Sequence, residues 1–191
     1  LGQTLAKYIS SFCSPYSPYF IFEPNAHCLA YLSDFIKSNK YEFVTLVPSA
    51  VSLSSGLSTL YLYNNSLTDA AATTIKNFRE NRTDIKKCLI SSLSFSDFAK
   101  EFCLEKASIC KIDVEGSELE VIRSILDADF IVDFFIVEIL PAYSSSNITR
   151  ISSQRQLLDL MFSRGYNCFR VIKSRDGRLS SFLSLNQIDI H

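Results

Sequence analysis

The chain has 191 residues, of which 47% are hydrophobic and 13% aromatic, and its formal net charge at pH 7 is -1. These values predict a single domain over residues 1–191 with an apolar core, and they exclude a disordered chain. The near-neutral charge, with lysines and arginines scattered along the chain, argues against a nucleic-acid-binding surface and against a basic membrane-binding patch. No apolar run reaches the roughly 18 residues of a membrane-spanning helix.

Six cysteines occur in the chain, and none of them forms a CxxC pair. We therefore expect no zinc site of the usual spacing. Most of the cysteines lie in apolar runs, as in Ile109-Cys110-Lys111-Ile112. We interpret them as buried, reduced thiols, which is typical of a cytoplasmic protein.

The first third of the chain alternates between helical and strand-like patterns. Apolar residues at helical spacing predict a helix over 3–12. A short apolar run predicts a buried strand over 19–22, which Glu23-Pro24-Asn25 ends. A helix is predicted over 26–38 with Asn25 as its N-cap, followed by a strand over 43–47.

The middle of the chain contains the longest ambiguous stretch. Residues 57–63 alternate in polarity, which predicts a strand at a sheet edge or in a hairpin. Residues 64–87 are polar and predict a loop, with a short helix near 70–78. A short strand over 89–93 and a helix over 95–104 follow, and either Ser94 or Ser96 is available as the helix cap.

The last third again alternates strands and helices. The patterns predict strands over 108–114 and 134–140, with helices over 117–126 and 153–164. Gly165 is a suitable C-terminal stop for the last helix. Strands are predicted over 166–172 and 182–190, and the short link at 174–178 predicts that they form an antiparallel hairpin.

This alternation predicts an α/β fold, with a mostly parallel sheet, helices on both faces and an antiparallel hairpin strand at the C-terminus. Ligands of such sheets bind outside the carboxyl ends of the strands. Four acids fall at or near those ends: Glu23, Asp113, Glu115 and Glu138. We therefore expect them to form the candidate site.

Each acid also has a structural interpretation. Glu23 fits the ribose-binding acid of a nucleotide-binding unit, or it simply begins a loop. Glu115 suits the N-terminus of a helix, whereas Glu118 and Glu120 are interpreted as solvated helix residues. Glu138 lies in an apolar run and needs a partner or a wet cleft, as does Lys111 on the strand face of Asp113. A structural ion pair between such groups is the alternative to a site.

Four short motifs carry a family resemblance. They are Phe22-Glu23-Pro24-Asn25, Ala50-Val51-Ser52 with Gly56 close behind, Lys111-Ile112-Asp113-Val114-Glu115-Gly116-Ser117-Glu118, and Val137-Glu138-Ile139. Their order and spacing over roughly residues 1–140 resemble the FkbM-type methyltransferase family. The resemblance implies a Rossmann-like class I methyltransferase fold that uses S-adenosylmethionine to methylate a hydroxyl of a sugar, lipid or secondary metabolite. Leu1-Gly2 resembles the end of the family's D-x-G-A-N-x-G motif, so the first strand is expected upstream.

The resemblance also implies roles for the residues around the cofactor. Gly2 would let the backbone approach the cofactor, and Glu23 would hold the ribose hydroxyls with Asn25 nearby. Ala50 and Val51 would border the adenine.

The remaining acids are assigned to the reaction. Asp113 and Glu115 would lie beside the methionine end of the cofactor and the acceptor, and Glu138 would face the acceptor cleft. An alcohol needs a general base, and neither His27 nor His191 is well placed. We therefore expect Asp113 first, and Glu115 second, to act as that base, with no metal ion.

Two other functions fit parts of the pattern. An acid after the second strand of a nucleotide-binding unit also suits a nicotinamide-dinucleotide-dependent oxidoreductase. A non-catalytic domain that retains the fold and binds a partner is the third possibility. The sequence upstream of Leu1 would separate the enzymes, because D-x-G-A-N-x-G supports methyl transfer and G-x-G-x-x-G supports hydride transfer.

Overall fold

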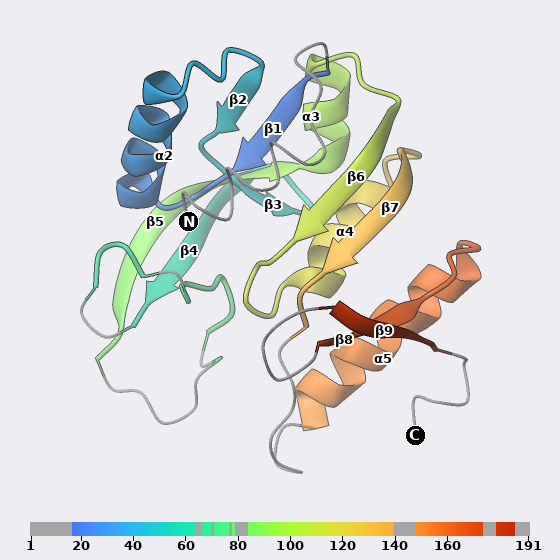
Figure 1. The fold of residues 1–191 in the computed structure, drawn as a ribbon. Coiled ribbons are helices and arrows are strands. Elements are labelled where there is room, and N and C mark those ends of the chain that lie inside the picture. Colours follow the sequence, from blue (N-terminus) through green and yellow to red (C-terminus); the bar gives the residue numbers. More distant parts are fainter. Residues whose placement is uncertain are drawn as a thin grey trace. The chain divides into compact units, whose positions relative to one another are not determined.

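The computed structural model describes residues 17–63, 66–69, 71–76, 78, 84–139, 148–173 and 179–185. The chain divides into two compact units, Leu1–Val137 and Glu138–His191. The predicted helix over 3–12 and the predicted site residue Gly2 lie outside the described residues. The α/β class is confirmed, since both units contain strands and helices (Figure 1).

The first unit begins with a parallel strand pair joined by a helix. Strand β1 (Tyr19–Phe22) pairs with β2 (Val44–Val47), in register from Tyr19↔Val44 to Phe22↔Val47. Helix α2 (Ala26–Ser38) connects them. These elements confirm the predicted strand over 19–22 and helix over 26–38, and the strand predicted over 43–47 is one residue shorter.

A three-stranded sheet follows, in the order β3-β5-β4. Strand β5 (Lys86–Ser94) pairs in parallel with β3 (Ala50–Ser52) and antiparallel with β4 (Gly56–Leu62). Strand β4 thus lies at a sheet edge, as its alternating sequence predicted. Leu60, Leu62 and Ile90 form the core of this sheet. Strand β3 was not predicted, and β5 begins earlier than the strand predicted over 89–93.

The short helix predicted near 70–78 is wrong for the described part of that stretch. Residues 71–76 and 78 form turns and an isolated antiparallel bridge between Thr73 and Tyr61 of β4. The carboxylate of Asp69 accepts hydrogen bonds from the backbone amides of Tyr63, at 2.6 Å, and Ala71, at 3.0 Å. Such side-chain bonds compete with the helical ladder and stabilise a loop instead.

The rest of the first unit is a second parallel pair flanked by helices. Helix α3 (Phe95–Glu101) precedes β6 (Lys106–Ile112), α4 (Glu118–Leu126) and β7 (Ile131–Val137). Strands β6 and β7 are parallel, and each begins two or three residues before its predicted start. Both also end before the predicted final residue, so Asp113 and Glu138 follow their strands.

Aromatic packing joins the first strand pair to α3. The ring of Phe98 contacts Phe20 and Phe22 of β1, with centroid distances of 5.0 and 4.7 Å. The arrowheads of β1, β2, β6 and β7 point to the same side of this unit (Figure 1). The hydrogen-bonded strands of the described chain nevertheless form four small sheets. The parallel pairs therefore share a direction without sharing a backbone ladder.

The second unit contains helix α5 (Ile148–Ser163) and an antiparallel hairpin of β8 (Phe169–Lys173) and β9 (Leu179–Ser184). Gly165, with a φ of +82°, follows the helix and confirms the predicted stop. The predicted antiparallel pairing is also confirmed, although α5 begins five residues before the expected start. The link at 174–178 and the tail after 185 lie outside the described residues.

Two general features complete the description. The five described cysteines are free thiols, of which Cys28 is buried and Cys103 is exposed. Burial raises the pKa of Cys110 to about 12. Within the described ranges, no helix is both long and apolar enough to cross a membrane.

Candidate functional site

Glu23 directly follows β1 and anchors a short turn. Its backbone amide donates to the carbonyl of Val47 at 3.1 Å, which extends the β1–β2 ladder by one bond. Its side-chain Oε1 accepts from the amide of Asn25 at 2.8 Å. Burial raises the pKa of the Glu23 carboxyl, and the hydrogen bond from Asn25 opposes that rise. Glu23 is therefore a half-buried acid, and its side-chain oxygen Oε1 stabilises the turn that follows it.

Asn25 is buried, and both ends of its side-chain amide are occupied. Oδ1 accepts from the amide of His27 at 3.1 Å and caps α2, as the sequence predicted. Nδ2 donates to the carbonyl of Leu67 at 2.9 Å. Asn25 thus connects the turn after β1 to the loop after β4.

Asp69, in the loop after β4, is a second acid near the Glu23 turn. Burial raises the pKa of the Cys28 thiol, and the negative charges of Glu23 and Asp69 raise it further. Both carboxylates therefore lie close enough to the α2 thiol to act on it electrostatically.

The turn after β6 carries two acids in different settings. Asp113 is 43% exposed, and its Oδ2 pairs with Nζ of Lys111 at 2.5 Å. Glu115 has a φ of +52°, which costs a residue other than glycine roughly 1–2 kcal/mol. Its oxygen Oε2 is buried. The sequence left a structural ion pair open as the alternative to a site, and Lys111 forms such a pair with Asp113.

Glu118 corrects one of the predictions. It was interpreted as a solvated helix residue, but it is only 8% exposed, and its Oε1 accepts from the amide of Gly116 at 2.8 Å. The hydroxyl of Ser117, at the N-cap position, makes no capping bond to α4. Glu118 thus holds the turn from inside the first helical turn. Glu120 is exposed, as predicted.

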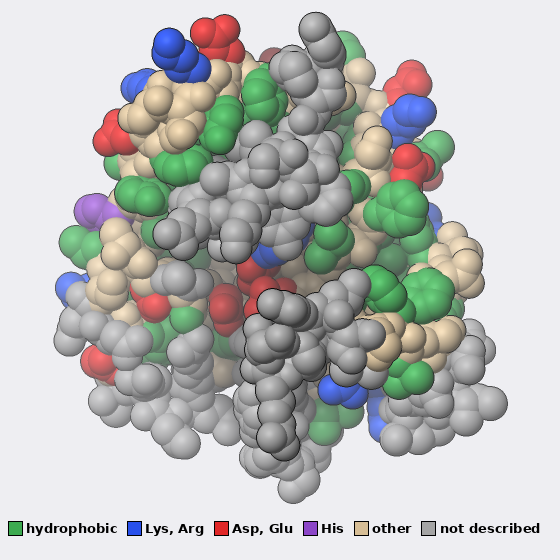
Figure 2. All heavy atoms as spheres, viewed as in Figure 1, with side chains coloured by type: hydrophobic (Ala, Val, Ile, Leu, Met, Phe, Trp, Pro, Cys, Tyr) green, Lys and Arg blue, Asp and Glu red, His purple; other side chains and the backbone are tan. Residues whose placement is uncertain are grey.

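The loop after β4 is bonded to both sides of this turn. Oγ1 of Thr73 donates to the carbonyl of Glu115 at 2.8 Å. Oγ1 of Thr74 and Oγ of Ser117 share a hydrogen bond of 2.7 Å. Together with the bond from Asn25 to Leu67, these contacts connect the loops after β1, β4 and β6 within one unit. Figure 2 shows acidic side chains gathered near the end of β6.

The remaining predicted site residues lie in strand β3 and directly after strand β7. Ala50 and Val51 are half-buried in β3 and pair with Ser92 and Leu93 of β5. Glu138 was expected in a buried strand, but β7 ends at Val137 and Glu138 is exposed. It belongs to the second unit.

Sequence reasoning missed the residues that connect the loops. Thr73 and Thr74 lie in a polar stretch whose conformation depends on contacts about 40 residues away in sequence, such as that between Thr73 and Glu115. The only local signal was the threonine pair itself. No group of three or more His, Cys, Asp and Glu side chains that could hold a metal ion occurs in the described part of the chain.

Comparisons with known proteins identify the family of the chain. The family described as the methyltransferase FkbM domain matches residues 2–168. The hexuronic acid methyltransferase AglP of Haloferax volcanii is 28% identical over 145 residues, which cover 76% of this chain and 56% of that protein. The chain thus spans little more than half the length of this relative. No solved structure matches the chain.

Proposed function

Because the chain belongs to the FkbM methyltransferase family, we propose that it supplies the catalytic fold of an S-adenosylmethionine-dependent O-methyltransferase. The acceptor is a hydroxyl of a sugar or glycan, and the name of the similar hexuronic acid methyltransferase supports this class over a lipid or secondary metabolite. A single Rossmann-like domain over 1–191, in a cytoplasmic protein, belongs to the same proposal.

The main support for the proposal is the hydrogen bonding and burial of the Glu23 carboxylate. Oε1 is engaged by the amide of Asn25, and no other bond to this carboxylate occurs among the described residues. Oε2 is therefore available, in a half-buried position, to accept hydrogen bonds from ribose hydroxyls. The turn after β1 thus fits the cofactor, and the fixed Asn25 amide keeps the acid in place.

The other residues assigned to the cofactor have smaller roles. Asn25 acts through the loop, since its side chain is already occupied by His27 and Leu67. Ala50 and Val51 supply small apolar surface for the adenine, and Gly2 allows a close backbone approach. When bound, S-adenosylmethionine supplies a methyl group on a positively charged sulfur.

The remaining task of the protein is to align the acceptor and remove its proton. Alignment of the acceptor oxygen provides the proximity effect, and a carboxylate within hydrogen-bond reach accepts the hydroxyl proton. Our proposal places Glu115 before Asp113 as the base, the reverse of the order expected from the sequence. Glu115 has a buried oxygen, whereas Asp113 is exposed and paired with Lys111. We therefore assign the base to Glu115, with Asp113 contacting the acceptor.

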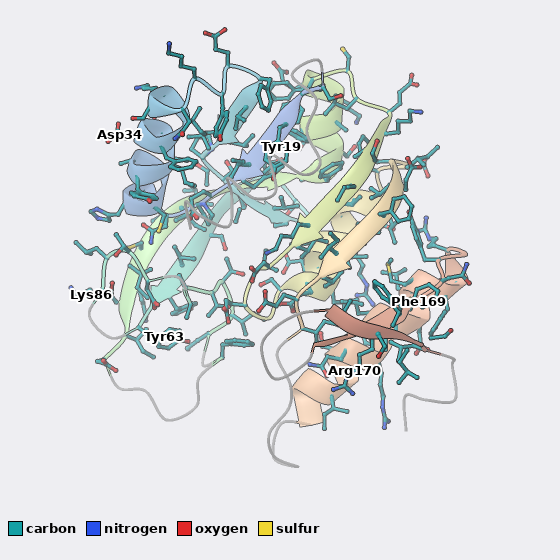
Figure 3. The ribbon with its side chains drawn as sticks, in the orientation of Figure 1. Tyr19, Asp34, Tyr63, Lys86, Phe169 and Arg170 are labelled. Atoms are coloured by element: carbon teal, nitrogen blue, oxygen red, sulfur yellow. The ribbon has the colours of Figure 1, made fainter. Side chains whose placement is uncertain are left out.

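Calorimetry on the full-length protein tests the proposal. We expect saturable binding of S-adenosylmethionine, which Glu23→Ala abolishes. Asp34→Ala is the matched control, because Asp34 lies on the outer side of α2 (Figure 3). A wild-type protein that binds no S-adenosylmethionine would contradict the proposal. Binding of a nicotinamide dinucleotide in its place would support the oxidoreductase, and binding of neither would support a non-catalytic domain.

A further inference from the structure

Thr73 is a buried polar residue at the centre of the contacts between the loop after β4 and the turn after β6. It is 1% exposed. Its backbone forms a bridge with Tyr61 of β4, through bonds of 2.8 and 3.2 Å. Its hydroxyl donates to the carbonyl of Glu115 at 2.8 Å and accepts from the amide of Ile75 at 3.1 Å. Thr73 therefore connects a sheet edge directly to the backbone of Glu115.

The backbone of Glu115 needs such a connection. Its φ of +52° is followed by a φ of +108° at Gly116, so two consecutive residues occupy the left-handed region. Residues other than glycine persist there only when surrounding contacts hold them. Besides Thr73, the bond between Thr74 and Ser117 and the ring of Phe78 beside Gly116 hold the turn.

From these contacts we propose that Thr73 is a positioning residue for Glu115, an inference that rests on the proposed function. The Thr73 hydroxyl fixes the Glu115 carbonyl, which fixes the peptide plane and hence the direction of the Glu115 side chain. Without the hydroxyl, the turn relaxes and the carboxylate loses its alignment with the acceptor hydroxyl. The cofactor acid Glu23 lies in a different loop and keeps its bond to Asn25.

Steady-state kinetics of the full-length protein test the catalytic half of this inference. The probe acceptor is p-nitrophenyl glucuronide, a hexuronic acid glycoside, and the variants are Thr73→Val, Thr73→Ser and the control Thr59→Val on β4. For Thr73→Val we expect kcat to fall about tenfold, which corresponds to ~1.4 kcal/mol of lost transition-state stabilisation. The Kd of S-adenosylmethionine should stay within about twofold of wild type. Thr73→Ser should restore most of kcat.

A double-mutant cycle with Glu115→Gln separates positioning from a general structural effect. If Thr73 acts through Glu115, Thr73→Val should lower kcat much less in the Glu115→Gln background than in wild type. Additive losses would overturn the inference, as would a rise in the cofactor Kd that parallels the fall in kcat.

Amide hydrogen exchange tests the structural half without any substrate. Thr73→Val should speed exchange in residues 115–118 about tenfold and leave β1 and α2 unchanged, whereas Thr59→Val should not affect the turn. Unchanged exchange in the turn would overturn the inference even if the protein methylates another acceptor. Failure of the wild type to bind S-adenosylmethionine would instead refute the proposed function.

Discussion

The ring of Phe78 occupies the space where a side chain at Gly116 would begin. A Cβ added to Gly116 would lie 2.8 Å from Cδ2 of Phe78 and closer still to Cε2. The φ of +108° at Gly116 also disfavours any residue with a Cβ. Two independent constraints therefore require glycine in the turn after β6.

Replacing this glycine should be costly for both reasons. We expect Gly116→Ala to lower the free energy of unfolding by roughly 2–4 kcal/mol, from the backbone strain and from overpacking against Phe78. Gly165→Ala is the matched control, since Gly165 has a φ of +82° and no atom within 4 Å of the added Cβ. It should cost roughly 1–2 kcal/mol, the backbone part alone. Urea denaturation measures both, and equal losses would refute the role of Phe78.

Glu23→Gln should affect stability and binding in opposite directions. Burial raises the pKa of Glu23 above 4.5, so the folded state holds this proton more tightly than the unfolded state. The free energy of unfolding therefore falls as pH rises from 4.5 through the folded-state pKa. Glutamine keeps the acceptor for the Asn25 amide but removes the buried charge.

The Glu23→Gln variant should thus be more stable than wild type at pH 7. Its free energy of unfolding should fall less than that of wild type as the pH rises above 4.5. Its affinity for S-adenosylmethionine should fall at least tenfold, or roughly 1.5–3 kcal/mol for a hydrogen bond to a charged group. Denaturation at several pH values and calorimetry measure the two effects. Glu120→Gln, at an exposed acid of α4, should change neither. A destabilised Glu23→Gln protein would show that the charge supports the fold.

The regular elements could be predicted because their signals are local. Helix α2 and strand β1 follow from apolar spacing, and the cap at Asn25 and the stop at Gly165 follow from the chemistry of those single residues. The position of Glu23 directly after β1 followed from the same patterns.

The contacts between loops could not be predicted in this way. Thr73 and Glu115 are 42 residues apart, and no local pattern pairs a threonine hydroxyl with a distant carbonyl. Glu118 was misassigned because its position near a helix N-terminus fits both a solvated acid and a buried one that bonds the preceding turn. Glu138 was expected to be buried because the apolar run does not show that β7 ends at Val137.

The N-cap of α3 can be tested with a matched pair of variants, because the sequence predicted either Ser94 or Ser96 as the capping residue. The structure selects Ser94, whose hydroxyl accepts from the amide of Asp97 at 3.1 Å. Ser94→Ala should lower the free energy of unfolding by about 1 kcal/mol, the usual value of an N-cap, and Ser96→Ala by much less. Urea denaturation of both variants decides the matter, and equal losses would show that the cap bond contributes little.

The same cap has a defined pH dependence. Hydrogen bonds from Ser55 and Ser94 hold the pKa of Asp97 below its usual value of 3.8. The stability from this shift is therefore present above pH 3.8 and is lost as the pH falls through the folded-state pKa. The difference in stability between wild type and Ser94→Ala should shrink in that acidic range. A difference that stays constant from neutral to acidic pH would show that the Ser94 hydroxyl acts only on the helix backbone.

Asp113→Asn distinguishes an acceptor-binding role from a cofactor-binding one. An exposed ion pair such as that of Asp113 with Lys111 contributes about 0–1 kcal/mol, so the variant should fold with nearly wild-type stability. If Asp113 contacts the acceptor, calorimetry should give a cofactor Kd within about threefold of wild type, because uniform loss of acceptor binding appears in KM. Asp133→Asn, at an exposed position of β7, is the control. Complete loss of cofactor binding would instead assign Asp113 to the cofactor, and Glu115 would remain the only acid of this turn assigned to the acceptor.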